Sequence, residues 1–229
     1  MTTTPCTRRS FLASCATAGV AAAALPTIAR ADDASQPPAE EPAYLETYAC
    51  DVAVCGTGTA GLCAAARAAE LGAQVLVVEA LTENGLGGNS KYVEACWRAA
   101  NEEVIEASYA TMMDYHKNGA NAQLVRRFCN ESIDVFDWSR DSLGVHFAEG
   151  AGLESAQATS PAIKYAEDEE NGISAGKFAI LTMYDYCRSI GVEFVFDCRA
   201  REALTNEAGA VTGLACERLN GDRVRVDAK

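Results

Sequence analysis

Short apolar runs alternate with a glycine-rich turn and an alanine-rich stretch in the segment 50–79. Residues 50–55 carry little charge and place Val at alternate positions, which is typical of a strand buried in a parallel sheet. Residues 62–71 are strong helix formers, and Gly72 suits the left-handed conformation that ends many helices. Another apolar run, at residues 74–78, predicts the next strand. The order strand, turn, helix, strand indicates an α/β fold with a parallel sheet.

The middle of the chain has the apolar period of helices. We expect one helix at residues 102–117 and another from Asn121, a suitable N-cap, through Trp138. The expected apolar face of the latter comprises Leu124, Val125, Phe128, Val135 and Phe136. A third helix follows residues 172–176 and ends at Gly191. Its apolar positions are Phe178, Leu181, Tyr184 and Cys187.

Strands are expected again in the last part of the sequence. Residues 192–198 predict one strand, residues 201–205 and 211–216 a hairpin, and residues 223–226 a further strand. We therefore expect a Rossmann-like domain over residues 49–229, with a parallel sheet, a helical insertion and a small β-hairpin unit.

The glycines of the first turn occupy the positions that a dinucleotide-binding loop requires. Gly56 permits a tight turn, Gly58 lets a pyrophosphate approach the backbone, and Gly61 lets the helix pack closely on the sheet. Backbone N–H groups at the start of the helix, including that of Ala60, lack helical partners and attract phosphate oxygens. This context predicts a dinucleotide site whose geometry serves FAD and NAD alike.

An acidic residue, Glu79, ends the second strand and lies 18 residues after Gly61 (79 − 61 = 18). A carboxylate there can accept hydrogen bonds from a ribose diol, and it would repel the 2′-phosphate of NADP. A second small-residue turn follows, formed by Gly87, Gly88, Asn89 and Ser90. We expect this turn to bring backbone amides and two polar side chains to the same pyrophosphate.

With these motifs in order, the sequence resembles the flavoprotein family of fumarate reductases and succinate dehydrogenases, which includes exported urocanate and related enoate reductases. In that family the first glycine-rich turn, the Glu and the Gly-Gly-Asn-Ser/Thr turn all hold FAD. The resemblance therefore implies FAD as the cofactor. It also implies that the residue at Ala200 meets the adenine through its backbone.

The sequence departs from the family pattern in two places. Residues 91–97 replace a glycine-rich stretch that lies against the flavin ring in the family, and we interpret this as variation that the backbone absorbs. Family members also continue, past the sequence matching residues 226–229, into another buried strand and a glycine-rich turn that completes the FAD site. A capping domain follows, with the Arg and His that bind the carboxylate and protonate the substrate. We therefore expect a C-terminally incomplete FAD-binding domain and assign no catalytic residue.

The activity implied by the resemblance is FAD-mediated hydride transfer to a C=C bond conjugated to a carboxylate or carbonyl, as in anaerobic respiration. The implied partners are a small unsaturated acid or carbonyl substrate and a haem protein as electron donor. Three alternatives stay open: a truncated or split, non-catalytic FAD-binding fragment, a ketosteroid dehydrogenase-like flavoenzyme, and a plain NAD-binding module.

The cysteines and histidines give no metal signature. There are ten Cys, eight of them after residue 31, and no Cys-x-x-Cys spacing for a metal or haem. Most occupy apolar positions, where Cys acts as a small hydrophobic residue, and one surface disulfide is the alternative. The two His, His116 and His146, have no partner spacing that suggests a metal or a catalytic triad. We expect no metal site.

The N-terminal segment has the order of an export signal. Arg8 and Arg9 precede an Ala-rich apolar stretch and the small residues Ala29–Ala31, which predicts a twin-arginine signal at residues 1–31. Pro26 and the weak hydrophobicity disfavour a membrane anchor. A lipoprotein signal at Cys15 is disfavoured because almost no apolar segment precedes it. We expect export to the periplasm or cell surface, without a stable membrane span after cleavage.

Composition adds a linker and excludes one class of partner. Residues 32–48, rich in Pro, Ala and acid, predict a disordered linker. The chain has 19 Lys and Arg against 32 Asp and Glu, a net charge of −13, and no basic stripe. A nucleic-acid backbone is held by clustered Lys and Arg, so we expect no nucleic-acid binding.

Overall fold

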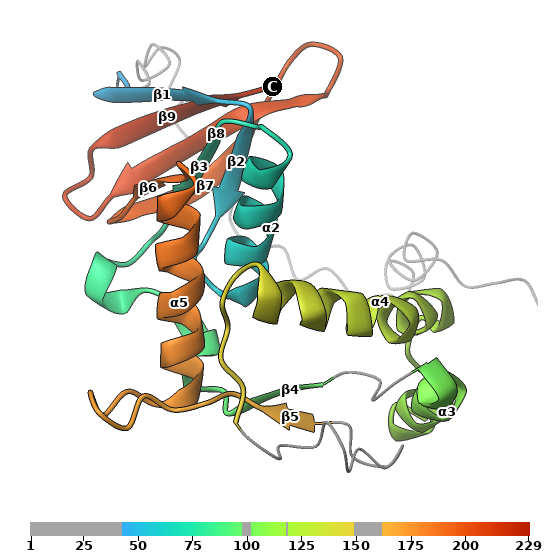
Figure 1. Ribbon diagram of the computed structural model, residues 1–229. Helices are drawn as coiled ribbons and strands as arrows, with labels where there is room; N and C mark the ends of the chain where they lie inside the picture. The colour runs from blue at the N-terminus through green and yellow to red at the C-terminus, as the bar shows by residue number, and fades with distance from the viewer. Residues whose placement is uncertain (1–42, 98–101, 118, 149–161) are drawn as a thin grey trace, which may run out of the picture. The chain divides into compact units, whose positions relative to one another are not determined.

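A parallel sheet of three strands forms the centre of the fold (Figure 1). The computed structural model describes residues 43–97, 102–117, 119–148 and 162–229. The order in the sheet is β2 (Val52–Cys55), β3 (Val75–Val78) and β6 (Glu193–Val195), and both pairs are parallel. The predicted parallel sheet is confirmed. The predicted export signal, residues 1–31, lies outside the described residues.

A helical crossover joins β2 to β3, as parallel neighbours require. This helix, α2 (Thr59–Glu70), starts three residues earlier than predicted. It buries Leu62, Ala65 and Ala66. Gly72, with φ of +90°, follows the helix in the left-handed conformation that was expected. The predicted strand–turn–helix–strand unit is therefore present.

The predicted hairpin belongs to a larger, four-stranded sheet with the order β1-β9-β8-β7. Here β7 (Cys198–Thr205), β8 (Val211–Arg218) and β9 (Arg223–Ala228) are antiparallel neighbours. The remaining strand, β1 (Glu46–Cys50), runs parallel to β9. Buried side chains from both sheets, among them Leu76, Val78 and Val224, pack together in one core cluster.

The position of β1 corrects two predictions. Residues 46–48 lie in this strand, so the end of the predicted disordered linker is wrong there. The predicted strand 50–55 is also interrupted at Asp51, whose carboxylate accepts a hydrogen bond from the backbone N–H of Gln74 (2.8 Å). The partner of β1 is β9, which lies far along the chain, and no local sequence pattern reveals such a partner.

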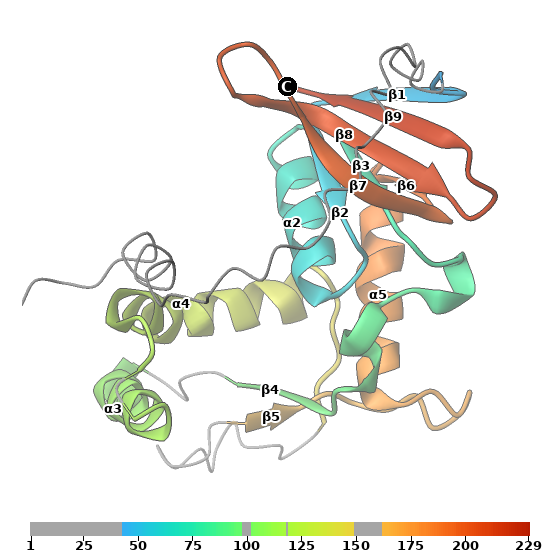
Figure 2. The same cartoon turned by 180° about the vertical axis from the view of Figure 1, so that it is seen from behind.

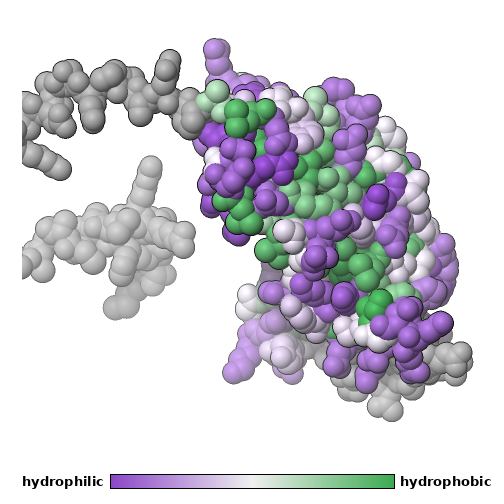
Figure 3. All heavy atoms as spheres, turned by 90° about the vertical axis from the view of Figure 1, so that its left-hand side faces the viewer, coloured by the Kyte–Doolittle hydropathy of each residue, from purple (hydrophilic) through white to green (hydrophobic). Residues whose placement is uncertain are grey.

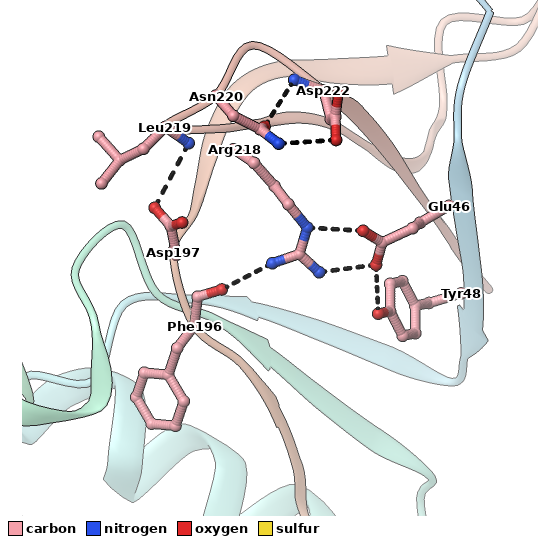
Figure 4. Close-up of polar contacts among 8 residues, drawn as sticks. All are labelled: Glu46, Tyr48, Phe196, Asp197, Arg218, Leu219, Asn220 and Asp222. Carbon is pink, nitrogen blue, oxygen red and sulfur yellow. Dashed lines mark hydrogen bonds and ion pairs between the residues drawn. The ribbon is translucent and has the colours of Figure 1, made fainter.

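Hydrogen bonds from the Arg218 side chain connect β1 to the rest of the sheet (Figure 4). Its Nε and Nη2 atoms each donate to the Glu46 carboxylate at 2.6 Å, and its Nη1 donates to the carbonyl oxygen of Phe196 at 3.0 Å. The hydroxyl of Tyr48 also donates to Glu46, at 2.7 Å. One guanidinium thus joins β1, β8 and the connection between β6 and β7.

The predicted helical insertion contains α3 (Ile105–Tyr115) and α4 (Ala122–Asp141), which pack against each other. Asn121 caps α4, its side chain accepting hydrogen bonds from two backbone N–H groups. A two-stranded antiparallel ladder of β4 (Ala95–Trp97) and β5 (Ala162–Lys164) lies near α4 (Figure 2). Short 3-10 helices occur at Glu83–Gly85, Gly88–Tyr92 and Glu102–Val104.

The buried face of α4 differs from the predicted face. Val125 and Phe136 are buried as expected, together with Cys129 and Ser132. In contrast, Leu124, Phe128 and Val135 are exposed by 67, 41 and 52%. Each exposed apolar residue thus immediately precedes a buried one in the sequence. The apolar stripe of α4 is therefore wider than the part of the helix that packs against the rest of the protein.

The third predicted helix, α5 (Ala175–Ser189), packs beside α2 and supplies Ile180, Met183 and Tyr184 to the larger core cluster. On the side of the molecule where α5 lies, hydrophobic patches are interrupted by hydrophilic residues (Figure 3). Among the described residues, none of the helices is long and apolar enough to cross a membrane.

The cysteines of the described residues are free thiols, and most are buried. The buried ones are Cys50, Cys129, Cys187, Cys198 and Cys216. Burial raises the pKa of the Cys63 thiol to about 11, so this group is protonated at neutral pH. These features agree with the prediction that most cysteines serve as small hydrophobic residues.

Candidate dinucleotide-binding site

The first glycine-rich turn follows β2 directly and is held against β3. Gly56 has φ of +90°, and its N–H donates to the carbonyl oxygen of Val78 at 2.8 Å. A Cβ atom on Gly61 would collide with the carbonyl oxygen of Gly56. The sequence therefore needs glycine at position 61 so that α2 can start this close to the turn, as predicted.

Gly58 differs from Gly61 because the fold itself does not require a glycine there. Its φ and ψ of −66° and 171° are ordinary extended values. A Cβ atom at this position would come no closer than 3.4 Å to Ser90 Oγ, which is a normal van der Waals contact. The direction in which a side chain would extend from Gly58 thus faces Ser90 and Gly87 of the second turn.

The carboxylate of Glu79 lies at the end of β3 and faces the first turn. The residue is only 6% exposed. Its Oε2 accepts hydrogen bonds from the N–H of Thr57 at 2.9 Å and from the Thr57 hydroxyl at 2.6 Å, while Oε1 accepts from the N–H of Leu81 at 2.9 Å. Burial by itself would raise the pKa of Glu79, but these hydrogen bonds outweigh it and hold the pKa below its ordinary value.

The second turn is attached to the first through Thr57. The backbone N–H of Gly87 donates to the Thr57 hydroxyl at 3.0 Å, and Gly87 adopts φ of +92°. Thr57 therefore contacts both Glu79 and the second turn. Sequence analysis missed this residue, although a hydroxyl between the first two glycines of the motif is the signal that could have identified it.

Ser90 connects the second turn to the start of α2. Its Oγ accepts a hydrogen bond from the N–H of Thr59 at 3.1 Å. The first helical hydrogen bond runs from Leu62 to Gly58, so the N–H groups just before Leu62 have no carbonyl partner within the helix. These groups and the partial positive charge of the helix start favour an anion at this point.

The other predicted site residues lie around the same place. Ala60 is exposed in the first turn of α2. Gly88 has φ of +50° and begins the 3-10 helix of the second turn. Asn89 is exposed beside it. The structure thus brings both turns and Glu79 together.

Ala200 lies in β7, and the first residue of this strand is hydrogen-bonded to the backbone of Glu79. The N–H of Cys198, the first residue of β7, donates to the carbonyl oxygen of Glu79 at 2.8 Å. The N–H of Glu79 donates in turn to Val195 at 2.9 Å. Ala200 lies two residues further along β7, opposite Cys216. The start of this strand is therefore placed next to the carboxyl end of β3.

The described residues fit a dinucleotide that carries a pyrophosphate between two sugars. The missing side chain at Gly58 and the N–H groups at the start of α2 suit the phosphates, and the carboxylate of Glu79 suits a hydroxyl donor. Thr57 donates to Oε2 of Glu79 and Leu81 to Oε1, and each carboxylate oxygen has more than one acceptor site.

The family model described as FAD binding domain matches residues 51–229. Digoxin reductase from Eggerthella lenta is 28% identical over 241 residues, covering 90% of this chain and 42% of the relative. Fumarate reductase (cytochrome) from Shewanella frigidimarina is 27% identical over 174 residues, covering 72% of this chain and 29% of the relative. The chain thus spans less than half the length of these relatives.

A solved structure shows the same fold. The 3-ketosteroid-delta4-(5alpha)-dehydrogenase from Rhodococcus jostii superposes with a TM-score of 0.66 at 23% identity, covering 79% of this chain and 44% of that protein.

These similarities define an FAD-binding domain of the kind found in reductases that resemble fumarate reductase. The chain belongs to the FAD binding domain family, and its cofactor is FAD. The predicted family and cofactor are confirmed.

Proposed function

We propose that the two glycine-rich turns and Glu79 hold FAD. We also propose that the protein functions as a reductase that acts on a C=C bond conjugated to a carboxylate or carbonyl. The observation that carries this proposal is the link that Thr57 makes between Glu79 and Gly87. It aligns two turns beside one helix N-terminus, where a pyrophosphate can contact both.

Each residue has a proposed role in holding the cofactor. Gly58 and Ala60 leave room and N–H groups for the pyrophosphate, and Glu79 accepts a hydrogen bond from the ribose. In the second turn Gly87, Gly88, Asn89 and Ser90 close over the same group. The backbone at Ala200 contacts the adenine, and Gly56 and Gly61 shape the turn. FAD, when bound, supplies the hydride chemistry, while the protein orients it and excludes water.

The wider setting is also proposed. Residues 1–31 would direct export by the twin-arginine route, which carries folded, cofactor-loaded proteins, so the enzyme would work outside the cytoplasmic membrane. A haem protein would donate electrons; the name of the Shewanella relative, fumarate reductase (cytochrome), supports this choice. The substrate would be a small unsaturated acid or carbonyl compound.

Reconstitution tests the proposal in two stages. The purified chain is mixed with FAD, freed of excess cofactor by gel filtration and examined by visible absorbance. We expect retained flavin near one equivalent, with no comparable retention of NADP. The retained flavin is then reduced with dithionite under argon and mixed with fumarate, urocanate or 4-androstene-3,17-dione.

The outcomes separate the functions under consideration. Reoxidation by fumarate or urocanate supports the reductase, whereas reoxidation by the steroid alone supports a ketosteroid-type enzyme. Flavin that is retained but not reoxidised by any of these compounds supports a non-catalytic FAD-binding unit. A chain that retains no flavin contradicts the cofactor assignment of the two turns.

A further inference from the structure

Two buried cysteines lie together on neighbouring strands of the four-stranded sheet. Cys198, the first residue of β7, is 0% exposed, and Cys216 in β8 is 2% exposed. The register places Cys198 opposite Arg218 and Cys216 opposite Ala200, so the two cysteines are diagonal neighbours on one face of the β7–β8 ladder. Both belong to the core cluster that joins the two sheets, and their thiols therefore share one buried place.

The two thiols contact each other directly. The thiol of Cys216 donates a hydrogen bond to the sulfur of Cys198, and this bond, with the nearby charge of Arg218, lowers the pKa of Cys198 against the opposing effect of burial. The same contact raises the pKa of Cys216. Cys198 is therefore the better nucleophile of the pair, and Cys216 supplies the second thiol that a disulfide needs.

Other buried cysteines have backbone partners instead. The thiol of Cys50, in the same core cluster, donates to the carbonyl oxygen of Asp227 at 3.7 Å, and the thiol of Cys187 donates to the carbonyl oxygen of Leu62 at 3.5 Å. Such thiols act as small hydrophobic side chains with one weak hydrogen bond. A thiol that faces a second thiol has a chemistry that these lack, because the two sulfurs can be joined.

The spacing of the two strands is close to that of a disulfide. Diagonal neighbours on antiparallel strands have Cα atoms roughly 7–8 Å apart, whereas a disulfide usually spans about 4.4–6.8 Å, so the two strands have to approach by about 1 Å. The strand that moves is β7, because it lies at the edge of the sheet and its ladder with β8 has a register shift just after Ala200. Most side chains of β7 are also exposed or half-buried.

From these features we infer that Cys198 and Cys216 are a redox-modification site, which forms a reversible disulfide by exchange with a small external disulfide such as oxidised glutathione. The oxidised chain would carry a covalent link between β7 and β8, next to the point where the N–H of Cys198 donates to the carbonyl oxygen of Glu79. The inference goes beyond the proposed function and does not depend on it, because neither cysteine is among the proposed FAD contacts.

The exchange takes place in two steps. The Cys198 thiolate attacks one sulfur of the external disulfide, which gives a mixed disulfide and releases one thiolate that takes up the Cys198 proton. Cys216 then loses its proton and attacks the Cys198 sulfur, and the second external thiol leaves with that proton. Two electrons pass from the protein thiols to the external disulfide, which is reduced to two thiols. Because both protein sulfurs are buried, the first step requires local opening of the edge strand β7.

Cross-link mapping under native conditions tests the inference. The purified chain is reduced, freed of reductant and equilibrated with mixtures of reduced and oxidised glutathione. Remaining thiols are blocked with N-ethylmaleimide, and the chain is digested without reduction for mass spectrometry. We expect a Cys198–Cys216 cross-linked peptide, lighter by two hydrogens, that increases with the oxidised share and disappears in the reducing mixture. The inference is wrong if this cross-link is absent, forms only in urea, or is outweighed by one between Cys216 and the exposed Cys55.

Matched variants separate the thiol pair from the packing around it. Cys216→Ala should leave Cys198 reduced or bound to glutathione, without a cross-link. Cys50→Ala removes a buried thiol from the same core cluster, and Cys55→Ser changes an exposed one; both should form the Cys198–Cys216 cross-link like the parent. Loss of the cross-link in folded Cys50→Ala and Cys55→Ser variants would overturn the inference. None of these measurements uses FAD, so failure of the cofactor assignment leaves them unchanged.

Discussion

The hydroxyl group of Thr57 lies 2.6 Å from Oε2 of Glu79 and donates a hydrogen bond to it. The Thr57 hydroxyl oxygen in turn accepts a hydrogen bond from the N–H of Gly87 at 3.0 Å. Thr57 is 1% exposed, so both hydrogen bonds are shielded from water. One buried hydroxyl therefore determines how the acid and the two turns lie relative to each other.

Replacing Thr57 with Val removes both hydrogen bonds at nearly constant volume. We expect the free energy of unfolding to fall by about 1–3 kcal/mol, because buried groups of Glu79 and Gly87 lose a partner. FAD affinity should fall as well. Urea unfolding and FAD titration measure the two effects. Thr57→Ser keeps the hydroxyl and serves as the control; if Ser and Val variants behave alike, the hydroxyl does not have this role.

The ion pair between Arg218 and Glu46 predicts a pH dependence of stability. The hydrogen bond from Arg218, followed by that from Tyr48, lowers the pKa of Glu46 from 4.5 to about 2. A lowered folded-state pKa stabilises the fold fully above the unfolded value, near 4.5, and this contribution is lost as the pH falls toward 2. Glu46→Gln should therefore flatten the loss of stability in this range.

Urea unfolding between pH 7 and pH 3 measures this effect. Glu207→Gln, at an exposed position between β7 and β8, is the matched control and should retain the parental slope. A Glu46→Gln variant with the same slope as the parent would show that the ion pair does not contribute to acid sensitivity.

Glu70 joins three helices and should matter for stability. Its carboxylate accepts hydrogen bonds from Trp138 Nε1 (3.0 Å) in α4, Tyr186 Oη (2.9 Å) in α5 and Arg67 (2.9 Å) in α2. Glu70→Ala should lower the free energy of unfolding by about 1–3 kcal/mol, since partly buried donors lose their acceptor. Asp134→Ala, exposed on α4, should change it little. Tryptophan fluorescence during urea unfolding reports both.

Two glycines of the α2 region predict different costs for the same substitution. Gly61→Ala places a Cβ atom against the Gly56 carbonyl oxygen and should prevent normal folding or destabilise strongly. Gly72→Ala meets no atom within 4 Å and has to overcome only its φ of +90°, which costs about 1–2 kcal/mol. Thermal unfolding ranks them; a Gly61→Ala variant as stable as Gly72→Ala would contradict the close approach.

The part of the fold that depends on neighbouring residues could be predicted from the sequence. The unit from β2 to β3 has its strands, glycines and helix formers in one short segment, and its four β3 residues are all buried as an apolar run suggests. β1 could not be predicted, because its partner β9 lies at the other end of the domain and Glu46 and Thr47 look like linker residues.

The same distinction holds for the site. The motif spacing predicts Gly58, Gly61 and Glu79 as site residues, and the close approach of α2 to the turn at Gly61 agrees with the glycine there. The hydrogen bonds from Thr57 to Glu79 and from Gly87 to Thr57 span 22 and 30 residues, so they depend on how the turns fold together. Whether the predicted contacts of Asn89 and Ala200 with FAD occur stays a prediction.

The most direct measurement of the central claim is the FAD affinity of Gly58 variants. A Cβ atom at Gly58 meets only ordinary contacts, so Gly58→Ala should unfold at nearly the parental temperature, and thermal unfolding of Gly58→Val shows whether its larger side chain is also accommodated. Both should nevertheless lose FAD, Val more completely, because the side chain occupies the place of the pyrophosphate. Ala64→Val, exposed on α2, should bind FAD normally. A folded Gly58→Val variant with parental FAD affinity would contradict the account.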